Sequence, residues 1–373
     1  MASQGFWGRF NLRNEDGKSC MRAIQNAYIG YRVKELEQQG YCSCTLLVAP
    51  LSGTEHSTIV DKDLAEEFEG RSTRSELIVQ LRPAPHALDL DIVHVAAKIY
   101  PSLAPTVALL DVELPEGLKA YEMDRIPGTS LSRLMPHART LTTKEQARLE
   151  TLVLSFAKFI AQGWQGASKA QTLPTLRATR ADSPMEDTPD ILSQCRGKVG
   201  SSIIYRLEKL AAELPDTYLR RRAGKTLSAI QNMTDYPVIL NHGDLIPSNI
   251  LVDGDRWEMT GLVDWAEAEF LPFGTCLYGL EHLLGYYERD SSSKKSAWVY
   301  FEGAARLREA FWEYLFAAAP GLKAREDEVR TMRDMGVLLW HGIAWDDGAI
   351  NRVVSELRDQ EELVKLRAFL GTD

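Results

Sequence analysis

The sequence lacks the cysteine pattern of a disulfide-stabilised protein. Its five cysteines are odd in number and scattered along 373 residues, whereas a disulfide framework shows an even set at regular spacing. A secretory signal is also missing, because residues 1–17 mix aromatic and charged side chains and contain no apolar core. We therefore expect a protein of a reducing compartment, located in the cytosol.

Long apolar runs and an excess of positive charge are missing as well. No uninterrupted apolar stretch approaches the length that crosses a bilayer. Lysine and arginine total 43 against 52 acidic residues, a formal net charge of -9, whereas nucleic-acid binding requires clustered basic residues. We therefore expect neither a membrane nor nucleic acid as a partner, and a neutral or cationic small molecule suits the acidic balance.

What is present is the composition of an ordinary globular enzyme. Hydrophobic residues make up 45% and charged residues 25% of the chain, which excludes disordered and fibrous classes. The length is sufficient for two lobes, each with its own core. Pro127 and Gly128 interrupt the chain, and we predict one lobe over residues 1–125 and a second over residues 126–373.

The most informative segment is residues 241–252, Asn-His-Gly-Asp-Leu-Ile-Pro-Ser-Asn-Ile-Leu-Val. Asp244 and Asn249 lie five residues apart in a predicted loop that ends on an apolar strand, and a second strand would bring Asp264 beside them. Phosphoryl transfer requires oxygen ligands for Mg²⁺ and an acceptor for the proton of the attacking hydroxyl. Two acids and an amide supply both, although aspartate and asparagine also shape ordinary turns.

Residues 242–252, together with Val-Asp-Trp at 263–265 and Pro-Phe-Gly at 272–274, resemble the aminoglycoside phosphotransferase and choline kinase families. These are the small-molecule branch of the protein-kinase-like fold. The resemblance implies a two-lobed α+β fold, with a small, mainly antiparallel β N-terminal lobe that covers the nucleotide. A larger helical C-terminal lobe would carry the catalytic and substrate-binding residues.

The resemblance also implies an activity and roles for the site residues. The enzyme would move the γ-phosphate of ATP to a hydroxyl, or less readily an amine, of a small metabolite. Asp244 would be catalytic, Asn249 and Asp264 would hold Mg²⁺, and His242 would brace the loop backbone. Two alternatives stay open: a pseudokinase or ligand-binding module, and an enzyme of different chemistry that reuses the kinase-like cleft.

The N-terminal lobe offers weaker candidates for contact with the nucleotide. Residues 51–60 resemble the phosphate-covering loop, with Gly53 as its one glycine, and an ordinary hairpin turn explains them equally well. The strand predicted over residues 76–82 contains no lysine where the family has one. Gln80 and Arg82 project from one face of that strand and either could take its place. Residues 121–128 resemble the hinge, where the backbone near Met123 would meet the adenine.

Apolar periodicity predicts the helices, and Thr142 with Glu145 has the form of a capping box that begins a long one. Other helices are expected over residues 20–39, 88–100, 201–214, 218–233, 277–289, 296–318, 325–342 and 350–370. Strands are expected over residues 41–49, 108–112, 118–123 and 237–240.

A possible acceptor site lies near the C-terminal end of one predicted helix. Asp346 and Asp347 are adjacent acids beside Trp345 and Trp340. Together they could bind a cationic or aromatic acceptor through ion pairing and cation–π contact. A helix end with exposed acids and core tryptophans explains the same residues, because helix termini collect aspartate and glycine.

Overall fold

The computed structural model describes residues 5–10, 12–37, 39–51, 76–170, 190–195, 197–289, 296–346 and 348–371. The chain divides into two compact units. The N-terminal unit comprises Met1–Ala97 and Ala104–Pro127, and the C-terminal unit comprises Lys98–Leu103 and Gly128–Asp373. The roles predicted for residues 1–125 and 126–373 stay predictions.

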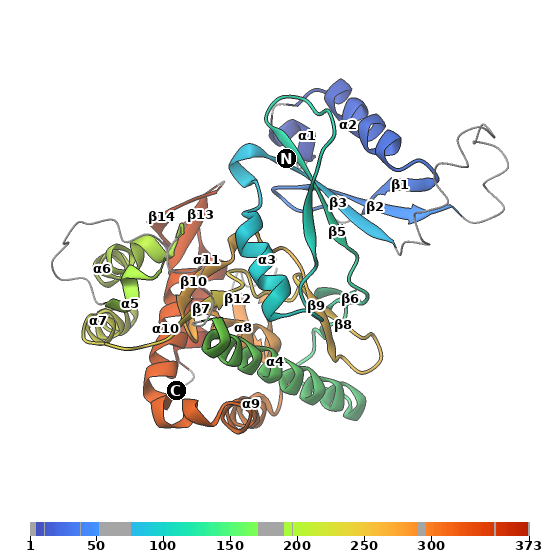
Figure 1. The fold of residues 1–373 in the computed structure, drawn as a ribbon. Helices are drawn as coiled ribbons and strands as arrows, with labels where there is room; N and C mark the ends of the chain where they lie inside the picture. The colour runs from blue at the N-terminus through green and yellow to red at the C-terminus, as the bar shows by residue number, and fades with distance from the viewer. Residues whose placement is uncertain are drawn as a thin grey trace. The chain divides into compact units, whose positions relative to one another are not determined.

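The described residues of the N-terminal unit form one antiparallel sheet, with strand order β1-β2-β3-β5-β4, and Figure 1 labels β1, β2, β3 and β5 of this sheet. The strands are β1 (Tyr31–Glu35), β2 (Cys44–Pro50), β3 (Leu77–Pro83), β4 (Val107–Leu110) and β5 (Leu118–Asp124). Alternate residues such as Leu46 and Val79 are buried together with Ile24, because side chains of a strand point to opposite faces. The predicted hairpin of β4 and β5 is confirmed.

The described residues of this part of the chain form three α-helices: α1 (Phe6–Arg9), α2 (Asn14–Ala27) and α3 (Leu90–Ile99). The prediction for α3 is confirmed, but the helix predicted over residues 20–39 is wrong in its second half. The chain turns at Gly30, whose φ of 83° lies in the left-handed region. Tyr31 to Glu35 then pair with β2.

The C-terminal unit holds two small antiparallel sheets around the predicted motif. One has the order β6-β8-β9, from β6 (Thr129–Ser130), β8 (Ile250–Val252) and β9 (Met259–Leu262). The other pairs β7 (Val238–Asn241) with β10 (Glu269–Pro272), so that Asn241 lies opposite Glu269. The loop between β7 and β8 is therefore anchored on a different sheet at each end.

Helices form most of the rest of this unit. They are α4 (Thr143–Ala170), α5 (Asp190–Ser193), α6 (Ile203–Glu213), α7 (Thr217–Gln231), α8 (Tyr278–Leu283), α9 (Ala304–Ala318), α10 (Glu326–Gly342) and α11 (Gln360–Leu370). The capping box before α4 is confirmed, because the Thr142 amide donates to Glu145 Oε2 (2.8 Å) and the Glu145 amide to Thr142 Oγ1 (3.3 Å). Among the described residues, no helix is both long and apolar enough to cross a membrane.

Three predicted helices contain strands instead over part of their length. β11 (Gly285–Arg289) follows α8 and pairs with β12 (Ser296–Tyr300), which corrects the predictions over residues 277–289 and 296–318. β13 (Ile343–Asp346) pairs with β14 (Ala349–Val353), which corrects the prediction over residues 350–370. These stretches are rich in aromatic and β-branched residues that favour a pleated, half-buried surface.

Candidate active site

The loop between β7 and β8 brings Asp244 and Asn249 into direct contact. Asn249 Nδ2 donates to the backbone oxygen of Asp244 (3.0 Å) and to its Oδ2 (2.7 Å). Asp244 Oδ1 is buried, and no hydrogen-bond partner for it exists in the part of the chain that the structure describes. A buried carboxylate oxygen without a partner is costly. This oxygen is therefore available to accept a hydrogen bond from a bound molecule.

The surroundings of Asp244 raise the pKa of its carboxyl toward neutral pH. The pKa rises to about 7, and burial is the largest cause. The negative charges of Asp264 and Glu267 raise the pKa as well, whereas the hydrogen bond from Asn249 lowers it. A general base works best when its pKa lies near the working pH. The carboxyl of Asp244 can therefore exchange a proton under ordinary conditions.

His242 braces this loop rather than carrying charge. Its Nε2 donates to the Val263 carbonyl (3.0 Å), and its Nδ1 accepts from the Asp244 amide (3.3 Å). Burial lowers the His242 pKa to about 4, so the ring is neutral and can donate from one nitrogen while accepting at the other. The ring also lies against Trp265, with centroids 4.5 Å apart. His242 therefore ties the Asp244 backbone to the segment that contains Asp264.

Gly243 allows the loop to approach that segment closely. Its φ is 79°, a left-handed value that glycine adopts without strain. A Cβ at this position would lie 1.8 Å from the backbone oxygen of Glu267. Only glycine fits, and the close approach brings the segment that contains Glu267 against the residue before Asp244.

Asp264 follows β9 and emerges beside Asn249. The Val263 amide donates to the Asn249 carbonyl (3.0 Å), in continuation of the pairing of β8 with β9. Asp264 itself has φ 63° and ψ 64°, a left-handed conformation that is uncommon outside glycine and is concentrated at functional sites. Its carboxylate is exposed. The two strands thus place Asp264 and Asn249 at neighbouring positions.

The residues predicted to hold Mg²⁺ have a donor set that fits the ion. Both hydrogen bonds recorded for the Asn249 side chain come from Nδ2, which leaves the amide oxygen for a cation. Mg²⁺ prefers oxygen and is commonly held by one or two carboxylates plus substrate phosphates. Across the described ranges, no cluster of three or more His, Cys, Asp or Glu residues could hold a metal. A set made of one amide and one carboxylate does not require such a cluster.

The residues predicted to contact the nucleotide lie on the N-terminal unit. Arg82 Nε donates to Gln80 Oε1 (2.9 Å), so the two side chains share one face of β3 as expected, and Arg82 is buried. Met123 lies on β5, opposite Ile78 of β3 and Val107 of β4. Gly53 lies outside the described residues. Nucleotide contact by these residues stays a prediction.

The predicted acceptor residues lie on the β13–β14 hairpin. Asp346 accepts hydrogen bonds from Arg352 at Oδ2 (2.9 Å) and Oδ1 (3.0 Å), and these bonds lower its pKa. Trp345 is 47% exposed, whereas Trp340 is stacked on Tyr278 with centroids 5.0 Å apart. Asp347 lies outside the described residues. Asp346 is thus already paired with a cation, and its role in binding an acceptor stays a prediction.

Two residues that act on the loop are missing from the sequence predictions. Glu267 belongs to the short 3₁₀ helix Trp265–Glu267 and acts on Asp244 through space. Tyr278 of α8 accepts a hydrogen bond from the Leu245 amide (3.0 Å) across a separation of 33 residues. A sequence signal exists only for Glu267, as an acid three residues after the motif aspartate.

Comparison with known proteins identifies a family for the chain. A family model described as "Phosphotransferase enzyme family" matches residues 66–274, more than half of the chain. The matched region includes Asp244, Asn249 and Asp264. Among curated proteins, no sequence matches the chain.

Solved structures resemble the chain over nearly its whole length. The GDP complex of wild-type aminoglycoside 2′-phosphotransferase-IIIa has a TM-score of 0.51 at 14% identity, covering 96% of this chain and 98% of that one. A putative aminoglycoside phosphotransferase from Ralstonia eutropha JMP134 has a TM-score of 0.52 at 11% identity, with coverage of 96% and 98%. At such identities the likeness concerns the fold, and it confirms the kinase-like α+β class with a small antiparallel sheet in its N-terminal part. The chain belongs to the phosphotransferase enzyme family.

Proposed function

We propose that this phosphotransferase moves the γ-phosphate of ATP to a hydroxyl group of a small metabolite, with an amine as the less favoured acceptor. The observation that carries this proposal is the state of Asp244. One of its carboxylate oxygens is held by Asn249, the other is buried with no partner among the described residues, and burial raises its pKa to about 7. An acceptor hydroxyl that donates to Oδ1 would satisfy that oxygen.

Asp244 would act as the proton acceptor in this reaction. The acceptor oxygen forms a bond to the γ-phosphorus, the bond between that phosphorus and the β,γ-bridging oxygen breaks, and ADP leaves with the electron pair. The hydroxyl proton passes to Asp244 Oδ1. Asn249 keeps the carboxylate oriented through Oδ2, and His242 keeps the Asp244 amide in place. Most of the catalysis is then positioning and charge neutralisation.

Asn249 and Asp264 would hold Mg²⁺ in this scheme. When bound, the ion supplies positive charge to the phosphate oxygens. The Val263 amide bonds to the Asn249 carbonyl, and Asp264 is the next residue, so strand pairing is enough to bring the two proposed ligands together. One of the similar solved structures is a GDP complex, which supports a nucleotide as the donor.

The acceptor class follows less directly from the site. The net charge of -9 and the acidic group formed by Asp244, Asp264 and Glu267 favour a neutral or cationic molecule over an anion. Trp345 is exposed enough to contact an aromatic or cationic group. We keep Trp345 and Asp346 as proposed acceptor contacts, but Asp346 would contribute little to binding because Arg352 occupies both of its oxygens.

A nucleotide-binding protein without turnover is the second candidate. It is favoured by β3, which has no lysine and where Arg82 is buried and bonded to Gln80. A thermal-shift measurement with Mg²⁺ and ATP separates binding from catalysis, because a ligand that binds the folded state raises the melting temperature. A shift without turnover of any acceptor favours this second candidate.

The main test is a screen of metabolite pools for ATP-dependent gain of a phosphoryl group, followed by mass spectrometry. We expect one or a few hydroxyl compounds to gain mass with the wild type and not with Asp244→Asn. Equal mass gain with Asp244→Asn would contradict the role of Asp244. If the wild type shows no mass gain with any compound and no thermal shift with Mg²⁺ and ATP, the proposed function as a whole is contradicted.

A further inference from the structure

The first turn of α8 contacts the catalytic loop at the residue after Asp244. The hydroxyl of Tyr278 accepts a hydrogen bond from the Leu245 amide (3.0 Å), and both residues are buried. A buried amide needs a partner, and its loss leaves the donor unsatisfied. This bond ties the Leu245 peptide to α8.

The next residue of α8 makes a second contact with the same place. A Cβ on Gly279 would lie 2.9 Å from the Cβ of Leu245 and 3.2 Å from its carbonyl oxygen. The helix therefore approaches the loop more closely than any other residue type would allow without a shift. Two successive residues of α8 meet Leu245, one through a hydrogen bond and one through close packing.

The ring of Tyr278 is itself held on several sides. It stacks on Trp340 of α10, with centroids 5.0 Å apart and planes inclined by 9°. The rings of His282 and His341 meet it edge-on, each with a centroid distance of 6.3 Å. Because the ring cannot swing freely, its hydroxyl presents a fixed acceptor to Leu245.

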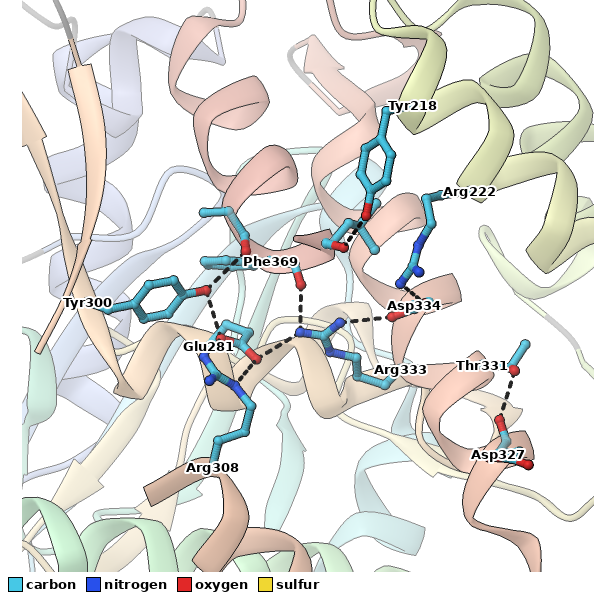
Figure 2. A network of polar contacts seen from close by, with 12 residues as sticks. Tyr218, Arg222, Glu281, Tyr300, Arg308, Asp327, Thr331, Arg333, Asp334 and Phe369 are labelled. Atoms are coloured by element: carbon cyan, nitrogen blue, oxygen red, sulfur yellow. Dashed lines mark hydrogen bonds and ion pairs between the residues drawn. The ribbon is translucent and has the colours of Figure 1, made fainter. Parts of the chain in front are cut away.

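A buried ion-pair network holds α8 in place, as Figure 2 shows around Glu281. Glu281 accepts hydrogen bonds from Arg308 (3.0 and 2.8 Å) and Arg333 (2.8 Å), and from the hydroxyl of Tyr300 (2.9 Å). Burial alone would raise the Glu281 pKa, but the hydrogen bonds and charges of the two arginines overcome this and lower it. The ionised carboxylate thus joins α8 to α9, α10 and β12.

Arg333 extends the network to the C-terminal helix. Its Nη2 also donates to the carbonyl oxygen of Phe369 on α11 (2.7 Å). The position of Tyr278, three residues before Glu281 on the same helix, is therefore set by four elements of the unit. These contacts connect the position of α8, and with it Tyr278, to the packing of the rest of the unit.

From these contacts we infer that Tyr278 is a positioning residue, which holds the Leu245 peptide and thereby the carboxylate of Asp244 in its reactive orientation. Three successive amides of the loop are then bonded: that of Asp244 to His242 Nδ1 (3.3 Å), that of Leu245 to Tyr278, and that of Ile246 to the Asp244 carbonyl (3.1 Å). The catalytic part of the inference rests on the proposed function. The part that concerns the loop backbone does not.

The experiment compares Tyr278→Phe with Tyr236→Phe. Tyr236 is also a buried tyrosine of the C-terminal unit, and its hydroxyl donates to the Phe273 carbonyl (2.9 Å). Both variants remove one buried hydroxyl, but Tyr236 does not bond to the loop. Amide exchange at the non-proline residues of 242–249, followed by NMR, reads the loop directly, and amides of α4 report any general loss of stability.

We expect Tyr278→Phe to speed exchange of the Leu245 amide by about tenfold or more relative to α4, and Tyr236→Phe to leave that ratio unchanged. Once an acceptor has been identified, Tyr278→Phe should lower kcat about tenfold and change the KM for the nucleotide less than about twofold. A misplaced catalytic group weakens stabilisation of the transition state but not binding of the substrate in the ground state. Equal exchange ratios in the two variants would overturn the inference.

The two proposals fail in different ways. If the wild type transfers no phosphoryl group, the proposed function fails, and the exchange ratio still decides whether Tyr278 holds the loop. If Tyr278→Phe does not fold, Trp340→Phe is measured instead, because it keeps the hydroxyl and changes the stacking partner of the ring. Faster exchange at Leu245 relative to α4 then supports the inference, and an unchanged ratio overturns it.

Discussion

Two aspartates of the C-terminal unit differ in how far their charge is satisfied. Asp244 has one buried oxygen without a partner among the described residues, and burial raises its pKa to about 7. Asp346 has both oxygens bonded to Arg352, which lowers its pKa. Strongly perturbed groups without a compensating partner concentrate at functional sites, whereas satisfied ion pairs are usually structural. The comparison thus favours Asp244 as the proposed reactive carboxylate and a structural role for Asp346.

The difference arises from the neighbours that each backbone supplies. Around Asp244 the charged neighbours Asp264 and Glu267 are both acidic, and within the described ranges the one polar bond to its side chain comes from a neutral amide. Around Asp346 the paired strand supplies Arg352, which also bonds Asp359 at 2.6 and 3.0 Å. The hairpin gains an ion-pair network, and the loop retains an unsatisfied charge.

The largest effect is expected from Asp244→Asn. Removing the proton acceptor should lower kcat by about 10³-fold or more, because a general base contributes roughly 10² to 10⁴. Asparagine has nearly the same shape, so nucleotide binding should change little. The measurement is steady-state turnover of the acceptor found in the screen, with Asp346→Asn as the matched control. Turnover that survives in Asp244→Asn would remove the distinction between the two aspartates.

The same substitution should stabilise the fold at high pH. A carboxyl whose folded pKa lies above its unfolded value of 3.8 disfavours the folded state as it ionises. The wild type should therefore lose stability as pH rises from about 4 to about 7, and Asp244→Asn should be more stable at pH 8 by about 2 to 4 kcal/mol. Urea unfolding at pH 4 and pH 8, without Mg²⁺ or nucleotide, measures the difference. Asp346→Asn should instead be less stable than the wild type at pH 8. If the free energy of unfolding depends on pH in the same way in both variants, the contrast between the two aspartates is contradicted.

A smaller effect is expected from Asp264→Asn on binding of the Mg²⁺-nucleotide complex. The variant keeps an amide oxygen but loses the charge, and asparagine tolerates the left-handed backbone at this position. The Kd for ATP in the presence of Mg²⁺ should rise about tenfold, which corresponds to about 1.4 kcal/mol. Calorimetry with and without Mg²⁺ tests this. An equal rise in both titrations would show that Asp264 does not act through the metal.

The motif around Asp244 could be predicted from the sequence because its parts are close together in the chain. The loop, the strand from Ile250 and the second strand before Asp264 lie within about 25 residues, and strand pairing alone brings them together. Glu267 acts through space, and Tyr278 reaches Leu245 only after α8 has packed. Contacts of this kind depend on tertiary packing, which periodicity does not encode.

The errors in secondary structure have a related cause. Residues 285–289 and 350–353 lie within predicted helices, but each stretch pairs with a neighbouring strand, β12 or β13. Short apolar runs do not distinguish a helix from a strand by periodicity. The β13–β14 hairpin brings Arg352 to Asp346. Because the sequence patterns do not predict this hairpin, they indicate Asp346 as an acceptor ligand and miss its ion pair with Arg352.

The smallest effect is expected from Asp346→Asn at the acceptor. Because Arg352 already occupies both oxygens of Asp346, the KM for the acceptor should change less than about twofold, and the melting temperature should fall by no more than about 2 °C. Kinetics with the acceptor from the screen and a thermal melt measure the two quantities, and Arg352→Met serves as the partner control. A tenfold rise in KM with an unchanged melting temperature would mean that Asp346 binds the acceptor, since an exposed ion pair that only supports the hairpin cannot alter ground-state binding without altering stability.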